Sequence, residues 1–286
     1  MNKVILFGGT GKLGTKIAAS LKNKNYHVTA VVRSDDKAQL LKPLVNETLV
    51  ADVSNPDELT DICKGFDIVI SSLGKSVSLK DKSKPGFKEI DLDANKNILK
   101  EALAASVKKF IYVSAFGAED HMHLNYFKYH AFFSEKLKRS GIDYSIIKPP
   151  AIMSSFIDLI EMAKNGKLIT IGKGDKVTNP IYEGDLADIC VESIKVKNAT
   201  VAAGGKMLYT RSHINEIIQH HINSDKKVKT VPMSLMKITV PFIRLINKNT
   251  YDKFAFYLEV MKHDTAAPKL GNTTLEQYLS EKMYLN

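Results

Sequence analysis

The residues best suited to chemistry in this sequence are the glycines of a short turn near the N-terminus. The turn consists of Gly8, Gly9, Thr10, Gly11, Lys12, Leu13 and Gly14. It follows an apolar run at residues 3–7, typical of a buried strand, and leads into a helical pattern at residues 15–21. In such a turn Gly9 permits a tight exit from the strand, Gly11 lets the backbone approach a pyrophosphate, and Gly14 lets the helix pack on the strand. The amide groups and positive dipole end of the helix would face the phosphates, so the turn predicts a bound dinucleotide.

The end of the second expected strand bears on which dinucleotide is bound. An NAD enzyme usually places Asp or Glu here to hold the ribose 2′-hydroxyl, whereas this sequence has Arg33. Arg33 can pair with a 2′-phosphate, and Lys12 can supply a second positive charge across the turn. These residues predict NADP(H) as the cofactor, the alternative being that Arg33 is an ordinary surface charge at a strand end.

Two further strand ends carry residues that suit contacts with the cofactor. Asp52 and Val53 follow the third strand, where the Asp52 carboxylate can accept a hydrogen bond from the adenine amino group, cap the next turn, or do both. Ser72, Leu73 and Gly74 follow the fourth strand. Small residues there allow close approach to the bridging region and ribose, although an ordinary strand-to-loop transition has the same composition.

Short apolar runs alternate with helical patterns through the first half of the chain. Strands are expected at residues 3–7, 28–32, 48–51, 66–71, 109–113 and 143–147. Helices are expected at residues 35–41, 56–64, 92–105 and 126–140. This alternation predicts an α/β fold with a doubly wound parallel sheet, a Rossmann domain for NAD(P) over residues 1–150.

The pattern changes after Pro149. Helices are expected at residues 156–164, from an N-cap at Asp185 to residue 194, and at residues 213–222, 233–245, 251–261 and 274–282, with strands at 168–172 and 207–210. We interpret residues 151–286 as a smaller, mainly helical substrate lobe, partly interleaved with the Rossmann sheet, that closes over the reactive end of the cofactor. The apolar helix at 233–245 carries Lys237 and Arg244 and would suit a membrane interface, but we expect it to dock on the protein's own sheet.

Together these motifs resemble the short-chain dehydrogenase/reductase superfamily, and specifically its atypical NmrA-like branch of NAD(P)-binding proteins. The resemblance covers residues 4–188 and is carried by residues 8–14, 33, 51–53, 110–114, 140–149, 179–181 and 184–187. It implies that Ser114, Lys148 and Pro149 border the nicotinamide and the substrate entrance, although many relatives carry Arg where this chain has Lys148. It also implies either an NADPH-dependent reductase or a protein that binds NADP and acts only as a redox-sensing regulator.

The superfamily that the chain resembles usually transfers a proton through a Tyr with a Lys one helical turn later, the Lys lowering the pKa of the Tyr. This spacing occurs twice here, at residues 144–148 and 278–282. The first pair lies on an expected strand, where four residues span about 13 Å, so the two side chains cannot share one site. The second pair is far in sequence from the strands that would hold the cofactor.

The helix after Ser114 offers a different set of catalytic candidates. Tyr126 and His130 are four residues apart and so share one face of that helix. A neutral His can donate a hydrogen bond to ribose or act as an acid, and Lys128 is a further candidate by resemblance to NmrA-like reductases. The alternative is an aromatic-rich helix that packs its rings into the core.

Composition and residue spacing bear on nucleic-acid binding, metal binding and cellular location. The 286 residues carry a net charge of +10, but their basic residues are mostly Lys spread along the whole chain, which does not favour nucleic-acid binding. Cys63 and Cys190 belong to no ligand cluster and are expected as buried thiols, and His121 and His123 lack further metal ligands at suitable spacing, so no metal is expected. No signal peptide precedes the first strand and no apolar run approaches the roughly 20 residues of a membrane span, so we expect a cytoplasmic protein without integral membrane association.

The sequence therefore predicts an NADPH-dependent reductase of a small apolar carbonyl, quinone or conjugated alkene. The apolar substrate class follows from the resemblance and from Met and Phe residues of the lobe, such as Met153 and Phe156, which would equally suit a plain core. One alternative is a non-catalytic NADP(H) sensor. Another is a sugar-nucleotide epimerase, which would need a Tyr–Lys pair and NAD, and Arg33 disfavours it. A small-molecule substrate and a monomer or homodimer are expected.

Overall fold

The computed structural model describes residues 2–284, and the chain divides into two compact units. The first unit comprises Met1–Lys75, Pro85–Lys148 and Glu183–Val201. The second comprises Ser76–Lys84, Pro149–Tyr182 and Ala202–Asn286. Each unit is therefore assembled from three segments that are separated in sequence.

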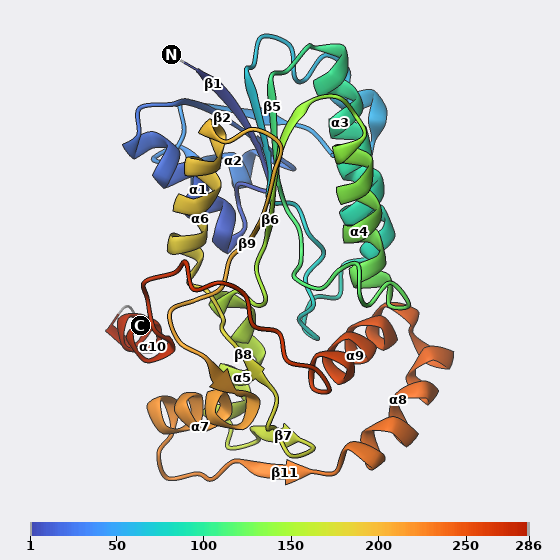
Figure 1. Ribbon diagram of the computed structural model, residues 1–286, viewed down its shortest axis with the longest axis vertical. Coiled ribbons are helices and arrows are strands. Elements are labelled where there is room, and N and C mark those ends of the chain that lie inside the picture. The colour runs from blue at the N-terminus through green and yellow to red at the C-terminus, as the bar shows by residue number, and fades with distance from the viewer. Residues whose placement is uncertain (1, 285–286) are drawn as a thin grey trace. The chain divides into compact units, whose positions relative to one another are not determined.

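The first unit is built on a seven-stranded sheet (Figure 1). Its strands are β1 (Lys3–Phe7), β2 (His27–Val32), β3 (Glu47–Val50), β4 (Ile68–Ser71), β5 (Lys109–Val113), β6 (Asp143–Lys148) and β9 (Ala199–Ala202). They lie in the order β3-β2-β1-β4-β5-β6-β9, and all neighbours from β3 to β6 pair in parallel. This is the strand order of the doubly wound dinucleotide-binding fold, so the predicted fold class is confirmed.

Helices cover both faces of this sheet. α1 (Lys12–Asn23) and α6 (Glu183–Glu192) lie side by side on one face, and α3 (Asn95–Ala104) and α4 (Asn125–Lys138) lie on the other (Figure 1). α2 (Asp35–Leu41) follows β2 and packs against β2 and β3. Because every strand-to-strand connection passes along a face, the loops that leave the carboxyl ends of the strands gather at one edge of the sheet.

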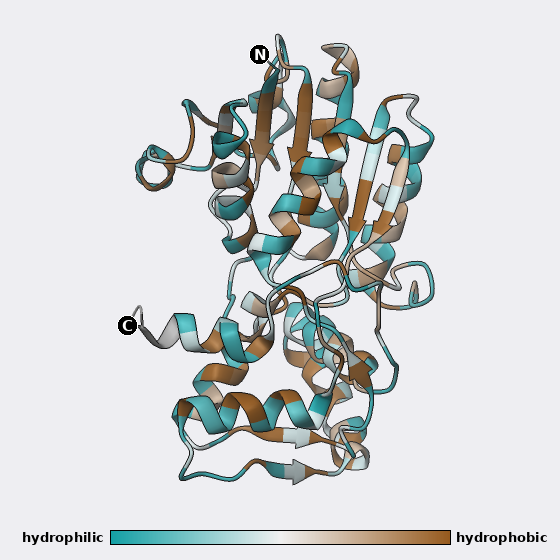
Figure 2. Ribbon diagram, turned by 60° about the vertical axis from the view of Figure 1, so that its left-hand side comes forward, coloured by the Kyte–Doolittle hydropathy of each residue, from teal (hydrophilic) through white to brown (hydrophobic). Residues whose placement is uncertain are grey.

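The central strands form because their side chains are buried on both faces. β4 and β5 are buried at every position, and β1 is buried except for Lys3 (Figure 2, brown strands). Ile5 and Phe7 pack with Phe110, Tyr112 and Phe133 in one apolar cluster. Such continuous apolar runs, rich in β-branched residues, are typical of parallel strands that have helices on both sides.

Two predicted helices of the first unit differ in the structure. The helix expected at residues 56–64 is only a 3₁₀ turn, η1 (Pro56–Leu59), because Thr60 leaves helical geometry with a ψ of 126° and Asp61 follows with a left-handed φ of 61°. The helix expected at 92–105 begins earlier, as a π-helical stretch η2 (Lys88–Ala94) that continues into α3. The Asn95 side-chain amide donates to the carbonyl oxygens of Ile90 and Asp91, at 3.2 and 3.1 Å, and so stabilises the wide turn.

Two smaller corrections concern the last part of this unit. α6 begins at Glu183, so Asp185 lies in its first turn and is not its N-cap as predicted. The edge strand β9 was not predicted, because its small residues give no apolar run. The thiols of Cys63 and Cys190 are free and buried, as expected, and burial raises the pKa of each to about 12.

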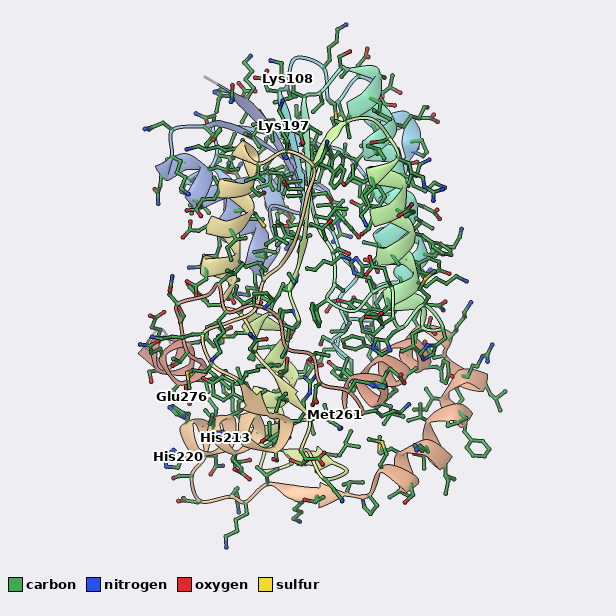
Figure 3. All side chains as sticks on the ribbon, in the orientation of Figure 1. Lys108, Lys197, His213, His220, Met261 and Glu276 are labelled. Atoms are coloured by element: carbon green, nitrogen blue, oxygen red, sulfur yellow. The ribbon has the colours of Figure 1, made fainter. Side chains whose placement is uncertain are left out.

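The second unit has a small core between helices. Around it lie η3 (Met153–Phe156), α5 (Ile157–Lys164), α7 (Arg211–Ile222) and α10 (Leu275–Tyr284). Two short strand pairs belong to the same unit. β7 (Ile169–Ile171) pairs with β11 (Lys229–Val231), and β8 (Val177–Thr178) pairs with β10 (Tyr209–Thr210). Met153 and Phe156 are buried in this core. Tyr209 joins two of the helices, because its hydroxyl donates to Glu276 at 2.9 Å and its ring contacts His213. Figure 3 labels these two partners, Glu276 and His213.

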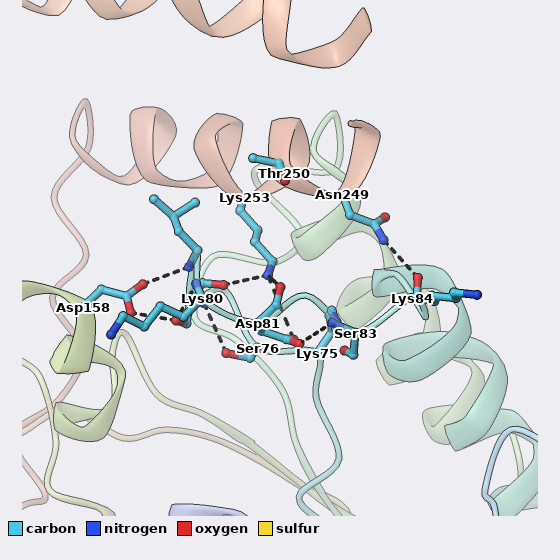
Figure 4. Close-up of polar contacts among 12 residues, drawn as sticks. Lys75, Ser76, Lys80, Asp81, Ser83, Lys84, Asp158, Asn249, Thr250 and Lys253 are labelled. Carbon is cyan, nitrogen blue, oxygen red and sulfur yellow. Dashed lines mark hydrogen bonds and ion pairs between the residues drawn. The ribbon is translucent and has the colours of Figure 1, made fainter. Parts of the chain in front are cut away.

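The segment 76–84 belongs to the second unit, where it is fixed by α9 (Lys248–Val260) and α5 (Figure 4). The Lys253 ammonium donates to the carbonyl oxygens of Ser78 and Asp81, at 2.6 and 2.7 Å. Asp158 accepts hydrogen bonds from the Ser78 hydroxyl and the Leu79 amide. Buried charge-assisted bonds of this kind hold a loop without secondary structure in one conformation.

α8 (Met233–Ile246) packs on α9 and leaves most of its apolar side chains exposed. The expectation that this helix docks on a sheet is not met within its own unit, where its main contact is with α9. Among the described residues, none of the helices combines the length and the apolar character needed to cross a membrane.

Candidate functional site

The glycine turn after β1 has a geometry that larger residues would disrupt. Gly8 has a φ of +80°, and a Cβ there would lie 2.9 Å from the carbonyl carbon of Ser72. A Cβ on Gly14 would lie 2.1 Å from the Gly8 carbonyl oxygen, so α1 can approach the turn only without a side chain. Buried Gly9 lies against Leu41. Gly8 and Gly14 are therefore required because any side chain at these positions would collide with the backbone of the turn or of the loop after β4.

The start of α1 is open to an anion. Its N-cap, Gly11, is extended, with φ −71° and ψ 164°, and makes no side-chain capping hydrogen bond. The first amide groups of α1 therefore lack an intrahelical acceptor, as at any helix start, and Thr10 and Lys12 beside them are exposed. Leu13 is buried beneath the turn and anchors it. These features fit a pyrophosphate, which needs free amides and a backbone that can be approached closely.

Arg33 and Asp52 lie beyond the carboxyl ends of the neighbouring strands β2 and β3. Both are exposed, whereas Val53 is buried in the core. Hydrogen bonds from the Ser54 hydroxyl and amide, at 2.7 and 2.9 Å, lower the pKa of the Asp52 carboxyl, and the charge of Arg33 lowers it further. Asp52 therefore caps the turn through Ser54. Its carboxylate can still accept a further hydrogen bond, such as one from an adenine amino group.

The loop after β4 is held in place by buried polar groups. The Ser72 hydroxyl donates to the Phe7 carbonyl oxygen at 3.2 Å, which ties this loop to the end of β1. Leu73 packs partly on the core, while Gly74 is exposed. The backbone amide of Lys75 donates to Asp91 Oδ1 at 2.7 Å. These contacts present Ser72, Leu73 and Gly74 at the same edge of the sheet as the glycine turn.

Asp91, which the sequence interpretation missed, is a buried acid at the centre of this region. It lies on η2 with no exposed surface, and among the described residues its Oδ2 atom has no hydrogen-bond partner. Burial raises the pKa of its carboxyl well above the ordinary value, although the hydrogen bond from Lys75 opposes this. Burial thus disfavours the charged form of the Asp91 carboxyl, and its Oδ2 atom is unpaired among the described residues.

Two tyrosines lie within electrostatic reach of Asp91. Burial raises the pKa of Tyr112 and of Tyr126, and the Asp91 carboxyl raises both further. Tyr126 also packs edge-on against Phe87 and His130. The Tyr126 phenol is consequently kept in its protonated form, the form that donates a proton.

His130 and Lys128 occupy different surroundings on α4. His130 is buried, its Nδ1 lies 2.6 Å from the Tyr112 hydroxyl, and burial lowers the pKa of its imidazole to about 4. The ammonium of Lys128 lies over the ring of Phe132, an exposed residue. The helix thus brings Tyr126 and His130 together, as predicted, but directs Lys128 to the side of α4 that carries Phe132.

The ends of β5 and β6 carry the remaining candidates. The Ser114 hydroxyl is buried 3.1 Å from the Ser134 hydroxyl. The ammonium of Lys148 donates to Glu119 Oε1 at 2.5 Å, and this bond lowers the pKa of the Glu119 carboxyl although burial acts in the opposite direction. Pro149 follows β6 directly and is the first residue of its segment of the second unit. Glu119 was not singled out in the sequence because an acid in a loop gives no signal of its partner.

Known proteins share sequence and fold with this chain. A model of the NAD(P)H-binding family matches residues 8–197. The photosystem II assembly factor Ycf39 of Trieres chinensis is 25% identical over 260 residues, which cover 88% of this chain and 80% of that protein.

Two solved structures share the fold. The NADPH-dependent quinone oxidoreductase QOR2 of Escherichia coli, complexed with NADPH, has a TM-score of 0.74 at 20% identity over 98% of this chain and 99% of that chain. The triphenylmethane reductase of Citrobacter sp., complexed with NADP(H), has a TM-score of 0.74 at 18% identity over 97% of this chain and 99% of that chain. At these identities the similarity establishes the fold.

Proposed function

Since the chain belongs to the NAD(P)H-binding family, we propose that it is an NADPH-dependent reductase of a small, largely apolar carbonyl, quinone or conjugated alkene. The observation that carries the proposal is the pairing of two features at one edge of one sheet. The open amides at the start of α1 suit the pyrophosphate, and a protonated phenol, Tyr126, lies within electrostatic reach of the buried Asp91 carboxyl beside the loop after β4. Similarity to a quinone reductase and to a triphenylmethane reductase gives further support.

Residues of the first unit would hold the coenzyme along this edge. The glycine turn and Lys12 would receive the pyrophosphate, Asp52 the adenine, and Ser72, Leu73, Gly74 and Ser114 the ribose and nicotinamide. Arg33 is exposed at the end of β2 and would pair with a 2′-phosphate, with Lys12 as a second cation. This arrangement favours NADPH over NADH.

Replacing Arg33 by alanine tests that preference. We expect the Kd for NADPH to rise about tenfold to a hundredfold, because charge-assisted hydrogen bonds to the phosphate are lost, while the Kd for NADH stays unchanged. Isothermal titration with both coenzymes measures the two values. Lys37→Ala, an exposed cation on the nearby α2, is the matched control and should change neither. Equal weakening of both coenzymes by Arg33→Ala would contradict the assignment.

The weak acidity of Tyr126 narrows the substrate class. When bound, NADPH supplies a hydride, and the reduced substrate then needs a proton on the atom that carries the new negative charge. A phenol with a raised pKa donates that proton poorly, so the acceptor must itself stabilise the charge. A quinone or a conjugated alkene delocalises the charge over several atoms, which favours these acceptors over a simple ketone.

Steady-state oxidation of NADPH tests the proposed activity. The panel comprises quinones, conjugated aldehydes, triphenylmethane dyes and simple ketones, with the rate in the absence of protein subtracted. We expect saturable turnover of about 1 s⁻¹ or faster with a conjugated acceptor and slower turnover with the ketones. Tight NADPH binding without oxidation by any of these acceptors would contradict a reductase.

A second candidate, a non-catalytic NADP(H) sensor, is favoured by one observation. No Lys stands one turn after Tyr126, where His130 is instead neutral and bonded to Tyr112. A site without the Tyr–Lys pair can bind the coenzyme and still lack turnover. Binding without oxidation in the experiment above is the result that would select this candidate.

A further inference from the structure

Helix α8 exposes an apolar stripe that no described residue of the second unit covers. Five of its large apolar residues are exposed, with fractions of 52% for Leu235, 65% for Ile238, 64% for Phe242, 85% for Leu245 and 87% for Ile246. On a helix with about 100° per residue, these positions fall within an arc of roughly 100°. They form one continuous face, which we name the α8 stripe.

The opposite side of α8 is the one that contacts the protein. Val240 is 3% exposed and, by the same helical geometry, projects about 180° away from the centre of the α8 stripe. α8 packs on α9 in Figure 1, and Arg244 lies over the ring of Tyr251 on α9. The helix is thus seated by its inner side, and the α8 stripe faces outward. An outward stripe of this size marks an interaction surface.

The chain through α8 and its immediate flanks is basic. From residue 226 to residue 251 the chain has six basic residues and no Asp or Glu. The basic residues are Lys226, Lys227, Lys229, Lys237, Arg244 and Lys248. The lysines of this set are exposed, so the stripe is accompanied by positive charge along and before the helix. Its complement is therefore an apolar surface that also carries negative charge.

We propose that α8 is an interfacial helix that binds the surface of an anionic lipid bilayer, with the α8 stripe inserted among the acyl chains and the surrounding lysines at the phosphate headgroups. Amphipathic helices with bulky apolar residues on one face and Lys or Arg on the other bind membranes in this way. With 14 residues the helix is too short to span a bilayer, and it lies in the interface plane. This surface is independent of the proposed reductase site.

A second copy of the chain fits the α8 stripe less well than a bilayer does. A helix of this length is about 21 Å long and presents an apolar strip about 10 Å wide, well below the roughly 800 Å² that each partner buries in a stable complex. Two copies facing each other would also bring their lysines together. A bilayer has neither limitation, because it deforms around the helix and supplies the negative charge.

Vesicle binding by the full chain tests the proposal. The chain has no Trp, so Phe242→Trp introduces a single reporter in the α8 stripe, and Leu40→Trp places the same reporter at an equally exposed position, 64%, on α2. With vesicles of equal parts phosphatidylglycerol and phosphatidylcholine, we expect a saturable blue shift of the emission for Phe242→Trp and none for Leu40→Trp. Pure phosphatidylcholine vesicles should bind at least about tenfold more weakly.

Two sets of variants separate the apolar and electrostatic contributions in vesicle co-sedimentation. Ile238→Ser combined with Leu245→Ser should weaken binding to the anionic vesicles at least about tenfold, because two large apolar side chains are lost. Lys227→Glu with Lys229→Glu should weaken it by a similar factor, whereas Lys195→Glu with Lys197→Glu, two exposed lysines elsewhere, should not. Circular dichroism confirms that each variant is folded.

Three outcomes would overturn the proposal. The first is the absence of binding to anionic vesicles. The second is equal binding by the Ile238→Ser, Leu245→Ser variant. The third is a dimer of the unaltered chain in sedimentation velocity that this double substitution converts to a monomer while vesicles remain unbound, which would assign the α8 stripe to self-association.

Discussion

Replacing Gly11 by alanine is expected to weaken NADPH binding about a hundredfold while the fold stays intact. Gly11 has an ordinary φ of −71°, and an added Cβ would meet only the Gly8 carbonyl oxygen, at 3.3 Å. The protein can therefore accept the methyl group, whereas a pyrophosphate held against the backbone cannot. Losing those amide contacts corresponds to about 3 kcal/mol, the hundredfold change expected in Kd. Isothermal titration measures the affinity, and thermal unfolding without coenzyme should shift by no more than a few degrees.

Gly14→Ala is the informative contrast to Gly11→Ala. A Cβ on Gly14 would lie 2.1 Å from the Gly8 carbonyl oxygen, so β1 and α1 would have to separate. We expect this variant to lose stability as well as binding, by a few kcal/mol. If Gly11→Ala bound NADPH as tightly as the unaltered chain, the pyrophosphate could not rest on the glycine turn, and the proposed orientation of the coenzyme would be wrong.

The sequence predicted the sheet well because parallel strands leave a strong local signal. β5 and β1 were predicted with their observed bounds. A short apolar run that ends in small or polar residues is typical of a buried parallel strand. The π-helical stretch η2 depends instead on hydrogen bonds from the Asn95 side chain to the backbone before it, which no periodicity reveals. β9 depends on a place at the sheet edge beside β6, which is a tertiary property.

The same distinction between local and tertiary signals separates the site residues that the sequence predicted from those that it missed. Residues that follow strands, such as Arg33 and Ser72, could be placed from the sequence because the carboxyl ends of parallel strands meet at one edge. Asp91 could not, because its importance comes from burial and from a hydrogen bond to Lys75, sixteen residues earlier. The partner of His130, Tyr112, lies on β5, and nothing in the spacing of α4 indicates that contact.

Replacing Tyr126 by phenylalanine is expected to lower kcat with a conjugated acceptor about a hundredfold, if Tyr126 donates the proton as proposed. Proton transfer by a positioned side chain contributes a factor of roughly 10² to 10⁴, and the raised pKa of this phenol places it at the low end. The Kd for NADPH should stay unchanged, because the phenol acts on the substrate. Tyr129→Phe, on the same helix, is the matched control and should leave kcat unchanged.

The pH dependence of kcat provides a second test of Tyr126. A proton donor is active while protonated, so activity falls as the pH rises through its pKa. Burial and the Asp91 carboxyl raise the pKa of Tyr126, so the alkaline fall should begin above the ordinary tyrosine value of about 10. Replacing Asp91 by asparagine removes the nearby acid and should move that fall to lower pH. A fall well below pH 10 that survives in Tyr126→Phe would show that another group carries the proton, and Tyr126 would then only line the site.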